Sequence, residues 1–217
     1  MSIEEKIKEL ILNWDETGLK EFCRTSIDNN EASPESIIKI IGEVMKLVGI
    51  KFEKEEYYVP ELIMASNVVK ATMGEVIDPA IKKLGMDERK TKGKVVIGTV
   101  EGDIHSIGKD LVGSFLFSNG FEVFNLGVDV SAQMFIEKAE EVGAQIIGLS
   151  ALITMSMDAQ RQVIEELKSR GIREKYKVIV GGSPTSEDWA EQIGADGWAD
   201  DAIEAVSLAK KLLNIQD

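Results

Sequence analysis

Up to about Leu84, apolar residues recur every three or four positions, which is the spacing of amphipathic helices. The third of the four helices predicted in this region has a clear start, with Ser33 as N-cap and Pro34 at the first helical position, and should end near Gly49. A fourth opens at Pro60. Two shorter helices precede these, with the apolar faces Ile7, Leu10, Ile11, Trp14 and Leu19, Phe22, Cys23, Ile27. Four helices joined by short connections predict a four-helix bundle.

After residue 93 the pattern changes to short apolar runs that alternate with amphipathic segments. The runs predict strands at 95–100, 122–125, 145–149, 177–180 and 197–198, and the segments predict helices at 107–119, 132–142, 157–169, 186–193 and 201–213. This alternation is typical of an α/β fold, here a flavodoxin-like (Rossmann-type) five-stranded parallel sheet with strand order 2-1-3-4-5. The charged stretch 87–93 is expected to be a linker. We therefore predict an all-α cap domain over 1–88 and an α/β domain over 89–217.

Composition narrows the class of protein. No apolar run reaches the roughly 18 residues of a membrane span. A formal net charge of −13 opposes binding to a phosphate backbone, so neither a membrane nor nucleic acid is an expected partner. The charged residues 1–6 resemble neither a secretory signal nor a transit peptide, and the single cysteine, Cys23, excludes an internal disulfide and is expected to be buried. These features predict a cytoplasmic location.

Three unusual loops should meet at one edge of the sheet. In the expected order the ligand crevice lies beyond the carboxyl ends of the first and third strands. Those ends are the loop with the only histidine, His105, and the segment 150–154, while Gly181-Gly182 at the end of the fourth strand borders the same crevice. The Gly181-Gly182 pair either admits a bulky ligand close to the backbone or is a plain turn before a helix capped by Ser183 or Thr185.

His105 has the form of a metal ligand, although a lone histidine on a polar loop is more often simply solvated. Asp103 is near enough in sequence to accept a hydrogen bond from one ring nitrogen, which leaves the other nitrogen free. Zinc needs three or four Cys, His or carboxylate ligands, which this chain does not offer together. A metal held by one protein ligand must bring its other ligands, which points to a macrocyclic cofactor. The haem attachment signature Cys-x-x-Cys-His is absent.

At this point the residues resemble a known family. Asp103-x-His105-x-x-Gly108, then 41 residues to Ser150-x-Leu152, then 28 to Gly181-Gly182, is similar to the cobalamin-binding signature of methionine synthase and of corrinoid-dependent methyltransferases and mutases. The segments 48–52 and 58–62 resemble the helical cap of the methyltransferase branch. The family commonly has Asp directly after the histidine and Asn two residues after the glycine, where this chain has Ser106 and Asp110. These departures put the fine tuning of the site in doubt, but not cofactor binding.

The resemblance implies a role for each of these residues. His105 would be the lower axial ligand of the cobalt in cobalamin or a related corrinoid, oriented by Asp103 and displacing the cofactor's own base. Phe52 and Val59 would lie over the upper face of the corrin, although plain bundle core is the alternative. The lower face would rest on Gly102, Ile104 and Ser106, with Ile107 and Gly108 also binding the cofactor. The nucleotide tail would enter a channel lined by Ser150, Leu152, Thr154, Gly181 and Gly182 and closed near Ala202.

The resemblance also implies a function: a non-catalytic methyl carrier whose corrinoid is methylated in the working cycle. A substrate:corrinoid methyltransferase would load the methyl group from a methylamine, methanol, an aryl methyl ether or a betaine. An acceptor methyltransferase would pass it to tetrahydrofolate or a thiol, a reductive activase would restore the cobalt, and the cap would swing on the linker 87–93. The alternatives are an adenosylcobalamin mutase subunit, a cobalamin-sensing regulatory module and a flavodoxin-like interaction domain without cofactor.

Overall fold

The computed structural model describes residues 2–83 and 91–215, and its contacts divide the chain into two compact units, 1–90 and 91–217. Most of the predicted linker 87–93, and the predicted domain boundary at 88/89, lie outside the described residues. The end of the linker belongs to the second unit, because the Lys92 N–H donates to the Gly120 carbonyl (2.9 Å) and the Glu122 N–H donates to the Gly93 carbonyl (2.9 Å). None of the described helices is both long and apolar enough to cross a membrane.

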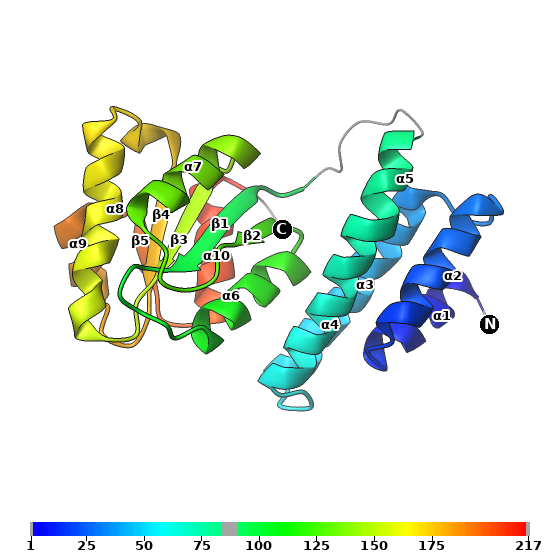
Figure 1. Ribbon diagram of the computed structural model, residues 1–217. Coiled ribbons are helices and arrows are strands. Elements are labelled where there is room, and N and C mark those ends of the chain that lie inside the picture. Colours follow the sequence, from blue (N-terminus) through cyan, green and yellow to red (C-terminus); the bar gives the residue numbers. More distant parts are fainter. Residues whose placement is uncertain (1, 84–90, 216–217) are drawn as a thin grey trace. The chain divides into compact units, whose positions relative to one another are not determined.

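The first unit is a bundle built on four main helices, as the apolar spacing predicts (Figure 1). Ser33 caps the third helix, since its hydroxyl accepts the Ser36 N–H (3.2 Å). Pro34 is the first residue of that helix. The helices are α1 (Ile3–Leu12), α2 (Glu16–Asp28), α3 (Pro34–Glu53), α4 (Val59–Thr72) and, after a π-helical turn (Met73–Ile77), α5 (Asp78–Lys83).

Two predicted boundaries in this unit differ from the structure, one of them by a single residue. Helix α3 does not stop near Gly49 but continues to Glu53. Gly49 faces open space, and its cost to the helix is the backbone conformational entropy that a glycine loses on folding. Helix α4 begins at Val59 rather than Pro60, with the Tyr58 N–H donating to the Glu61 carboxylate (3.0 Å). The bundle core is apolar and includes Cys23, whose burial raises the pKa of its thiol to about 12. Cys23 is therefore a packing residue.

The second unit is the predicted parallel sheet, with strand order β2-β1-β3-β4-β5 (Figure 1). The strands are β1 (Lys94–Thr99), β2 (Glu122–Asn125), β3 (Ile146–Ser150), β4 (Lys177–Gly181) and β5 (Gly197–Ala199). The helices are α6 (Ile107–Ser118), α7 (Ala132–Val142), α8 (Met157–Ser169), α9 (Glu187–Ile193) and α10 (Ala202–Leu212), with 3-10 turns at Thr154–Ser156 and Arg173–Lys175. The predicted strands and helices of this unit agree with these bounds to within one residue.

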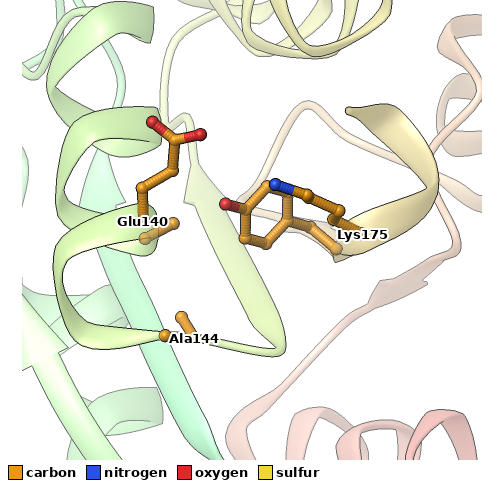
Figure 2. Close-up of a pocket in the computed structure, with 6 residues that line it drawn as sticks. Glu140, Ala144 and Lys175 are labelled. Carbon is orange, nitrogen blue, oxygen red and sulfur yellow. The ribbon is translucent and has the colours of Figure 1, made fainter. Parts of the chain in front are cut away.

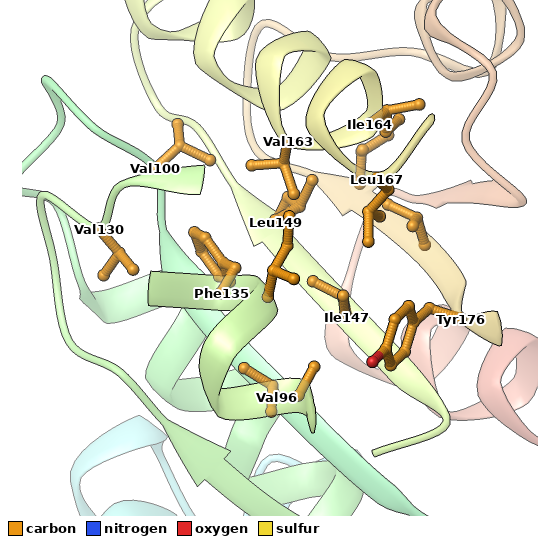
Figure 3. Packing of buried hydrophobic residues seen from close by; sticks show 14 of the residues in the cluster. Val96, Val100, Val130, Phe135, Ile147, Leu149, Val163, Ile164, Leu167 and Tyr176 are labelled. Carbon is orange, nitrogen blue, oxygen red and sulfur yellow. The ribbon is translucent and has the colours of Figure 1, made fainter. Parts of the chain in front are cut away.

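Alternation along the strands builds a core on each face of the sheet. One face carries Val96, Ile147 and Val178, which pack with Phe135 of α7 and Leu167 of α8 (Figure 3). The residues between them, such as Val95, Ile146 and Ile179, are buried on the opposite face. Because both faces are covered, only the strand ends and the loops that leave them are free to carry chemistry.

Candidate corrinoid-binding site

The three loops singled out from the sequence meet at one edge of the sheet. Strand register places Thr99 beside Ser150 and Ser150 beside Gly181, so β1, β3 and β4 end at the same level. The loop with His105 follows β1, the 3-10 turn follows β3, and Gly182 follows β4. The parallel register thus brings together residues that are up to 83 positions apart.

Asp103 is the polar centre of this edge. Its side chain is fully buried, and one oxygen, Oδ1, lies 2.7 Å from His105 Nδ1 and 3.0 Å from the His105 backbone nitrogen. The other oxygen, Oδ2, accepts the Leu152 N–H (2.7 Å), the Ile153 N–H (3.3 Å) and the Ser156 hydroxyl (2.8 Å). The carboxylate therefore joins the loop after β1 to the loop after β3.

These hydrogen bonds keep Asp103 ionised. Burial alone would raise the pKa of the carboxyl, but N–H donors from His105 and Leu152, the His105 ring and the Ser156 hydroxyl together hold the pKa well below its usual range. A charged acceptor at Nδ1 favours the tautomer with the proton on that nitrogen. The His105 side chain is half exposed, and its Nε2 has no protein partner among the described residues. Nε2 is thus presented as a lone-pair donor to a group from outside.

The surroundings of His105 suit a large apolar ring. The two loops that Asp103 joins carry four exposed apolar residues, with exposures of 76% for Ile104 and 73% for Ile107 after β1, and 44% for Leu152 and 89% for Met155 after β3. Gly102 and Gly108 have nothing close to the position where a Cβ would stand, so the surface is open at both, although the left-handed backbone of Gly102 (φ +82°) by itself favours glycine. Within residues 2–83 and 91–215 no three His, Cys, Asp or Glu side chains gather to hold a metal, so a metal on His105 must bring its remaining ligands. A corrinoid meets all three conditions.

The chain matches two families with known chemistry. Residues 93–207 match the family described as B12 binding domain, and residues 3–77 match a second family with the same description. A corrinoid protein of Desulfitobacterium hafniense is 41% identical over 98% of both chains. The chain belongs to the B12-binding corrinoid proteins.

Other relatives of this corrinoid protein fall in the same group. Trimethylamine corrinoid protein 1 of Methanosarcina acetivorans is 42% identical and covers 96% of this chain and 95% of its own. A solved cobalamin-binding protein of Desulfitobacterium hafniense is 31% identical with a TM-score of 0.64, covering 97% and 98% of the two chains. The methanol:cobalamin methyltransferase complex of Methanosarcina barkeri matches with a TM-score of 0.84 over 98% of this chain and 80% of the other, and at 24% identity it supports the fold.

In the Gly181-Gly182 pair of this corrinoid protein, Gly182 is required by the chain itself. Gly182 has a left-handed backbone (φ +118°), and a Cβ there would overlap the carbonyl of Ala151. The alternative caps were wrong: Ser186 caps α9 by accepting the Trp189 N–H (3.2 Å), and Thr185 instead donates to the Gly182 carbonyl (2.6 Å). The pair therefore lets the loops after β3 and β4 pass in contact, whether or not a ligand also lies there.

The remaining predicted site residues are placed as follows. Thr154 opens the 3-10 turn after β3, Ser106 is the N-cap residue of α6, and Ala202 is buried at the first position of α10. Phe52 and Val59 are half-buried in the helical unit, at the end of α3 and the start of α4. Contact of these residues with a corrinoid stays a prediction.

Among the residues around the site that the sequence did not reveal are Ser156, Lys109 and Asn125. The Ser156 hydroxyl donates to Asp103, and only the 3-10 turn brings it there.

Lys109 is buried at the start of α6 and donates to Asp110 (2.7 Å) and to Asn125 (2.9 Å), and Asn125 in turn donates to Asp110 (2.7 Å). Burial would raise the pKa of Asp110, but Lys109, Asn125 and Ser106 together lower it. Asp110, noted only as a departure from the family, therefore fastens α6 to the end of β2.

A separate hollow of about 350 Å³ lies at the other end of the sheet. Glu140 and Ala144 near the end of α7 line it together with Lys175 and Tyr176 before β4 (Figure 2). It borders the amino ends of the strands, whereas ligands of α/β sheets bind at the carboxyl ends. This hollow is not part of the corrinoid site.

Proposed function

We propose that this corrinoid protein is a methyl carrier that shuttles a methyl group between a substrate methyltransferase and an acceptor methyltransferase. Its relatives support the donor class: dimethylamine and trimethylamine corrinoid proteins of Methanosarcina are 42 to 48% identical to it. A methylamine is therefore the first donor to test, ahead of methanol, an aryl methyl ether or a betaine. The acceptor would be tetrahydrofolate or a thiol, and a reductive activase would keep the carrier in use.

The pair Asp103–His105 carries this proposal. The 2.7 Å contact at Nδ1 orients the ring, and the half-exposed Nε2 is the one imidazole nitrogen left for a ligand bond. When bound through Nε2, a corrinoid supplies a cobalt atom with methyl-transfer chemistry. The protein's part is to present Nε2, to hold the ring by a buried carboxylate and to cover apolar surface around it.

Other residues of the chain would hold the rest of the cofactor. The lower face would rest on the loop 102–108 and its exposed Ile104 and Ile107. The nucleotide tail would enter between the loops after β3 and β4, along Ser150, Leu152, Thr154, Gly181 and Gly182, with Ala202 closing the channel. Phe52 and Val59 of the helical unit would shield the upper face from water.

The carrier would work with partner enzymes because the described residues offer no Cys–His pair and no second histidine for the acid-base work of demethylating a substrate. The described residues include one histidine, and both its nitrogens are assigned above. Methyl transfer in and out would therefore need at least two partners. A cytoplasmic location is part of the proposal, supported by the free, buried Cys23.

The proposal is tested by loading the full-length protein with methylcobalamin and recording its absorption spectrum. A base-off, His-on spectrum is expected, followed by loss of the methyl group when an acceptor methyltransferase and its thiol are added. The demethylated protein is then given a methylamine methyltransferase with mono-, di- or trimethylamine, and with methanol as the matched control. Failure to bind the corrinoid, or binding without methyl transfer to or from any partner, would refute a carrier role.

A further inference from the structure

The loop that carries His105 is held through its backbone as well as through Asp103. The Thr99 hydroxyl, on the last residue of β1, donates to the His105 carbonyl at 2.7 Å. Thr99 is fully buried, and no backbone N–H among the described residues donates to this carbonyl. The Thr99 hydroxyl is therefore the group that ties the main chain of His105 to the sheet.

A second residue holds the same loop from the opposite end. Asp129, in the loop between β2 and α7, accepts the Gly102 N–H through Oδ1 (2.8 Å). Its own N–H donates to the Asp103 carbonyl (2.9 Å). Both Gly102 (φ +82°) and Asp129 (φ +55°) have left-handed backbones, which ordinary residues adopt at a cost and which Gly and Asp tolerate.

The segment that Asp129 belongs to is itself fastened to the end of β1. Val100 and Val130 form a parallel bridge and lie beside the buried core (Figure 3). The Val130 N–H donates to the Thr99 carbonyl (3.0 Å), and the Thr99 N–H donates to the Gly127 carbonyl (3.0 Å). Thr99 and Asp129 thus act from one rigid support, on either side of residues 102–105.

We propose that Thr99 and Asp129 are positioning residues that fix the backbone of the loop 102–105, so that the imidazole of His105 stands in place before the corrinoid arrives. This inference rests on the proposed function. Its physical basis is preorganisation: a ligand group whose backbone is already ordered loses less conformational entropy on binding. Asp103 sets the direction of the ring, and Thr99 and Asp129 set the place of the Cα from which the ring projects.

The test compares matched variants of the full-length protein, with methylcobalamin as the probe. Thr99→Val keeps the shape of the side chain and removes the hydroxyl, and Thr99→Ser keeps the hydroxyl. Asp129→Ala removes the acceptor of the Gly102 N–H, and Asp129→Asn keeps an oxygen acceptor and tolerance of the left-handed backbone. Thr72→Val is the control, because Thr72 is also fully buried and also donates to a backbone carbonyl, that of Val68 (2.9 Å), within the helical unit.

Two quantities are measured, the dissociation constant for methylcobalamin and the fraction of bound corrinoid with a His-on spectrum. For Thr99→Val we expect binding on the order of ten-fold weaker and a partial loss of the His-on fraction, as for other outer-shell partners of metal ligands. For Asp129→Ala, whose side chain is exposed in the wild type, we expect about three-fold weaker binding, as for the loss of one hydrogen bond, with the same spectral change. Thr99→Ser, Asp129→Asn and Thr72→Val should match the wild type in the His-on fraction.

The outcomes separate the two proposals. If the wild type does not bind methylcobalamin with a His-on spectrum, the proposed function fails. If the wild type does so and Thr99→Val or Asp129→Ala matches it in both quantities, the positioning role fails. Should Thr99→Val not fold, Asp129→Ala decides alone, because its side chain is exposed and its loss leaves the core intact.

Discussion

Two carboxylates stand at opposite ends of the same sheet, Asp103 fully buried and Asp196 half-buried, and they are satisfied in different ways. Asp103, at the carboxyl ends of the strands, accepts hydrogen bonds from backbone N–H groups, a serine and an imidazole. Asp196, just before β5, accepts the Val178 N–H (2.8 Å) and pairs with Arg173 (2.6 Å) and Lys177 (3.3 Å). Burial alone would raise the pKa of each carboxyl group, but the hydrogen-bond donors outweigh this effect, and the pKa of both Asp103 and Asp196 is lowered.

The two carboxylates differ in whether their side-chain partners, Arg173 and His105, keep a nitrogen that can bind a ligand. The Arg173 guanidinium donates to Asp196 and to the carbonyls of Tyr176 and Gly194. We call this cluster closed, because its guanidinium is bound to groups within the protein. His105 gives Nδ1 to Asp103 and keeps Nε2 free at a half-exposed edge. A closed cluster stabilises the fold, whereas an open one holds a group ready for a ligand, and the following substitutions test this distinction.

The largest effect is expected for His105→Ala, which removes Nε2 altogether. The fold should persist, since the side chain is half exposed and its loss leaves no large cavity. Methylcobalamin should still bind through apolar contacts, but the His-on absorption spectrum should be absent. Added imidazole gives a control, because it should restore part of that spectrum by occupying the vacated space. A His-on spectrum in the variant without added imidazole would mean that another group is the ligand.

Asp103→Asn should weaken corrinoid binding by about 10- to 100-fold. Donors point at both carboxylate oxygens, so an amide NH₂ must face either the His105 donors or those of Leu152 and Ser156. The His-on fraction and the free energy of unfolding should both fall. Titration with methylcobalamin and chemical denaturation measure the two effects, and normal binding in a destabilised variant would show that Asp103 is only a fold residue.

For Asp196→Asn we expect the opposite division. Loss of the charge-assisted bonds to Arg173 should lower the free energy of unfolding by about 2 kcal/mol, with corrinoid affinity and spectrum unchanged. Because the pKa of Asp196 is lowered in the fold, its contribution is fully present above the usual Asp pKa of about 4 and is lost as the pH falls toward the folded value. Denaturation at pH 7 and pH 3 should therefore show a smaller difference between wild type and variant at pH 3.

The Asp103–His105 side of this comparison was accessible from the sequence because it depends on local spacing and parallel topology, whereas the Asp196 cluster was not. Asp103 and His105 are two residues apart, and the strand order brings the loops after β1, β3 and β4 together. The resemblance to cobalamin-binding proteins then pointed to a corrinoid. In the helical unit the predicted end near Gly49 failed, because glycine is tolerated inside a helix that packing supports.

What the sequence did not reveal depends on side chains that meet only in the folded chain. Thr99 reads as an ordinary strand residue, and nothing in its neighbours indicates a hydrogen bond to the His105 carbonyl. The sequence left Gly182 either as a ligand-facing glycine or as part of a plain turn, and it did not reveal that the Ala151 carbonyl excludes a Cβ there. Ser156 lies 53 positions from Asp103, and only the 3-10 turn after β3 brings its hydroxyl to the carboxylate.

Ser156→Ala should give the smallest of the four effects and shows how far the open cluster extends. It removes one of the donors to Asp103 Oδ2, while the Leu152 N–H stays at 2.7 Å, so the carboxylate remains ionised and satisfied. The loss of one such bond corresponds to about 1 kcal/mol, or roughly five-fold in affinity for methylcobalamin. Ser169→Ala is the control for removing a serine hydroxyl, because the exposed Ser169 donates to the Glu166 carbonyl at the end of α8. If Ser156→Ala binds methylcobalamin as tightly as Ser169→Ala does, the part of Asp103 that steers the imidazole is Oδ1 alone, and Oδ2 serves only to join the two loops.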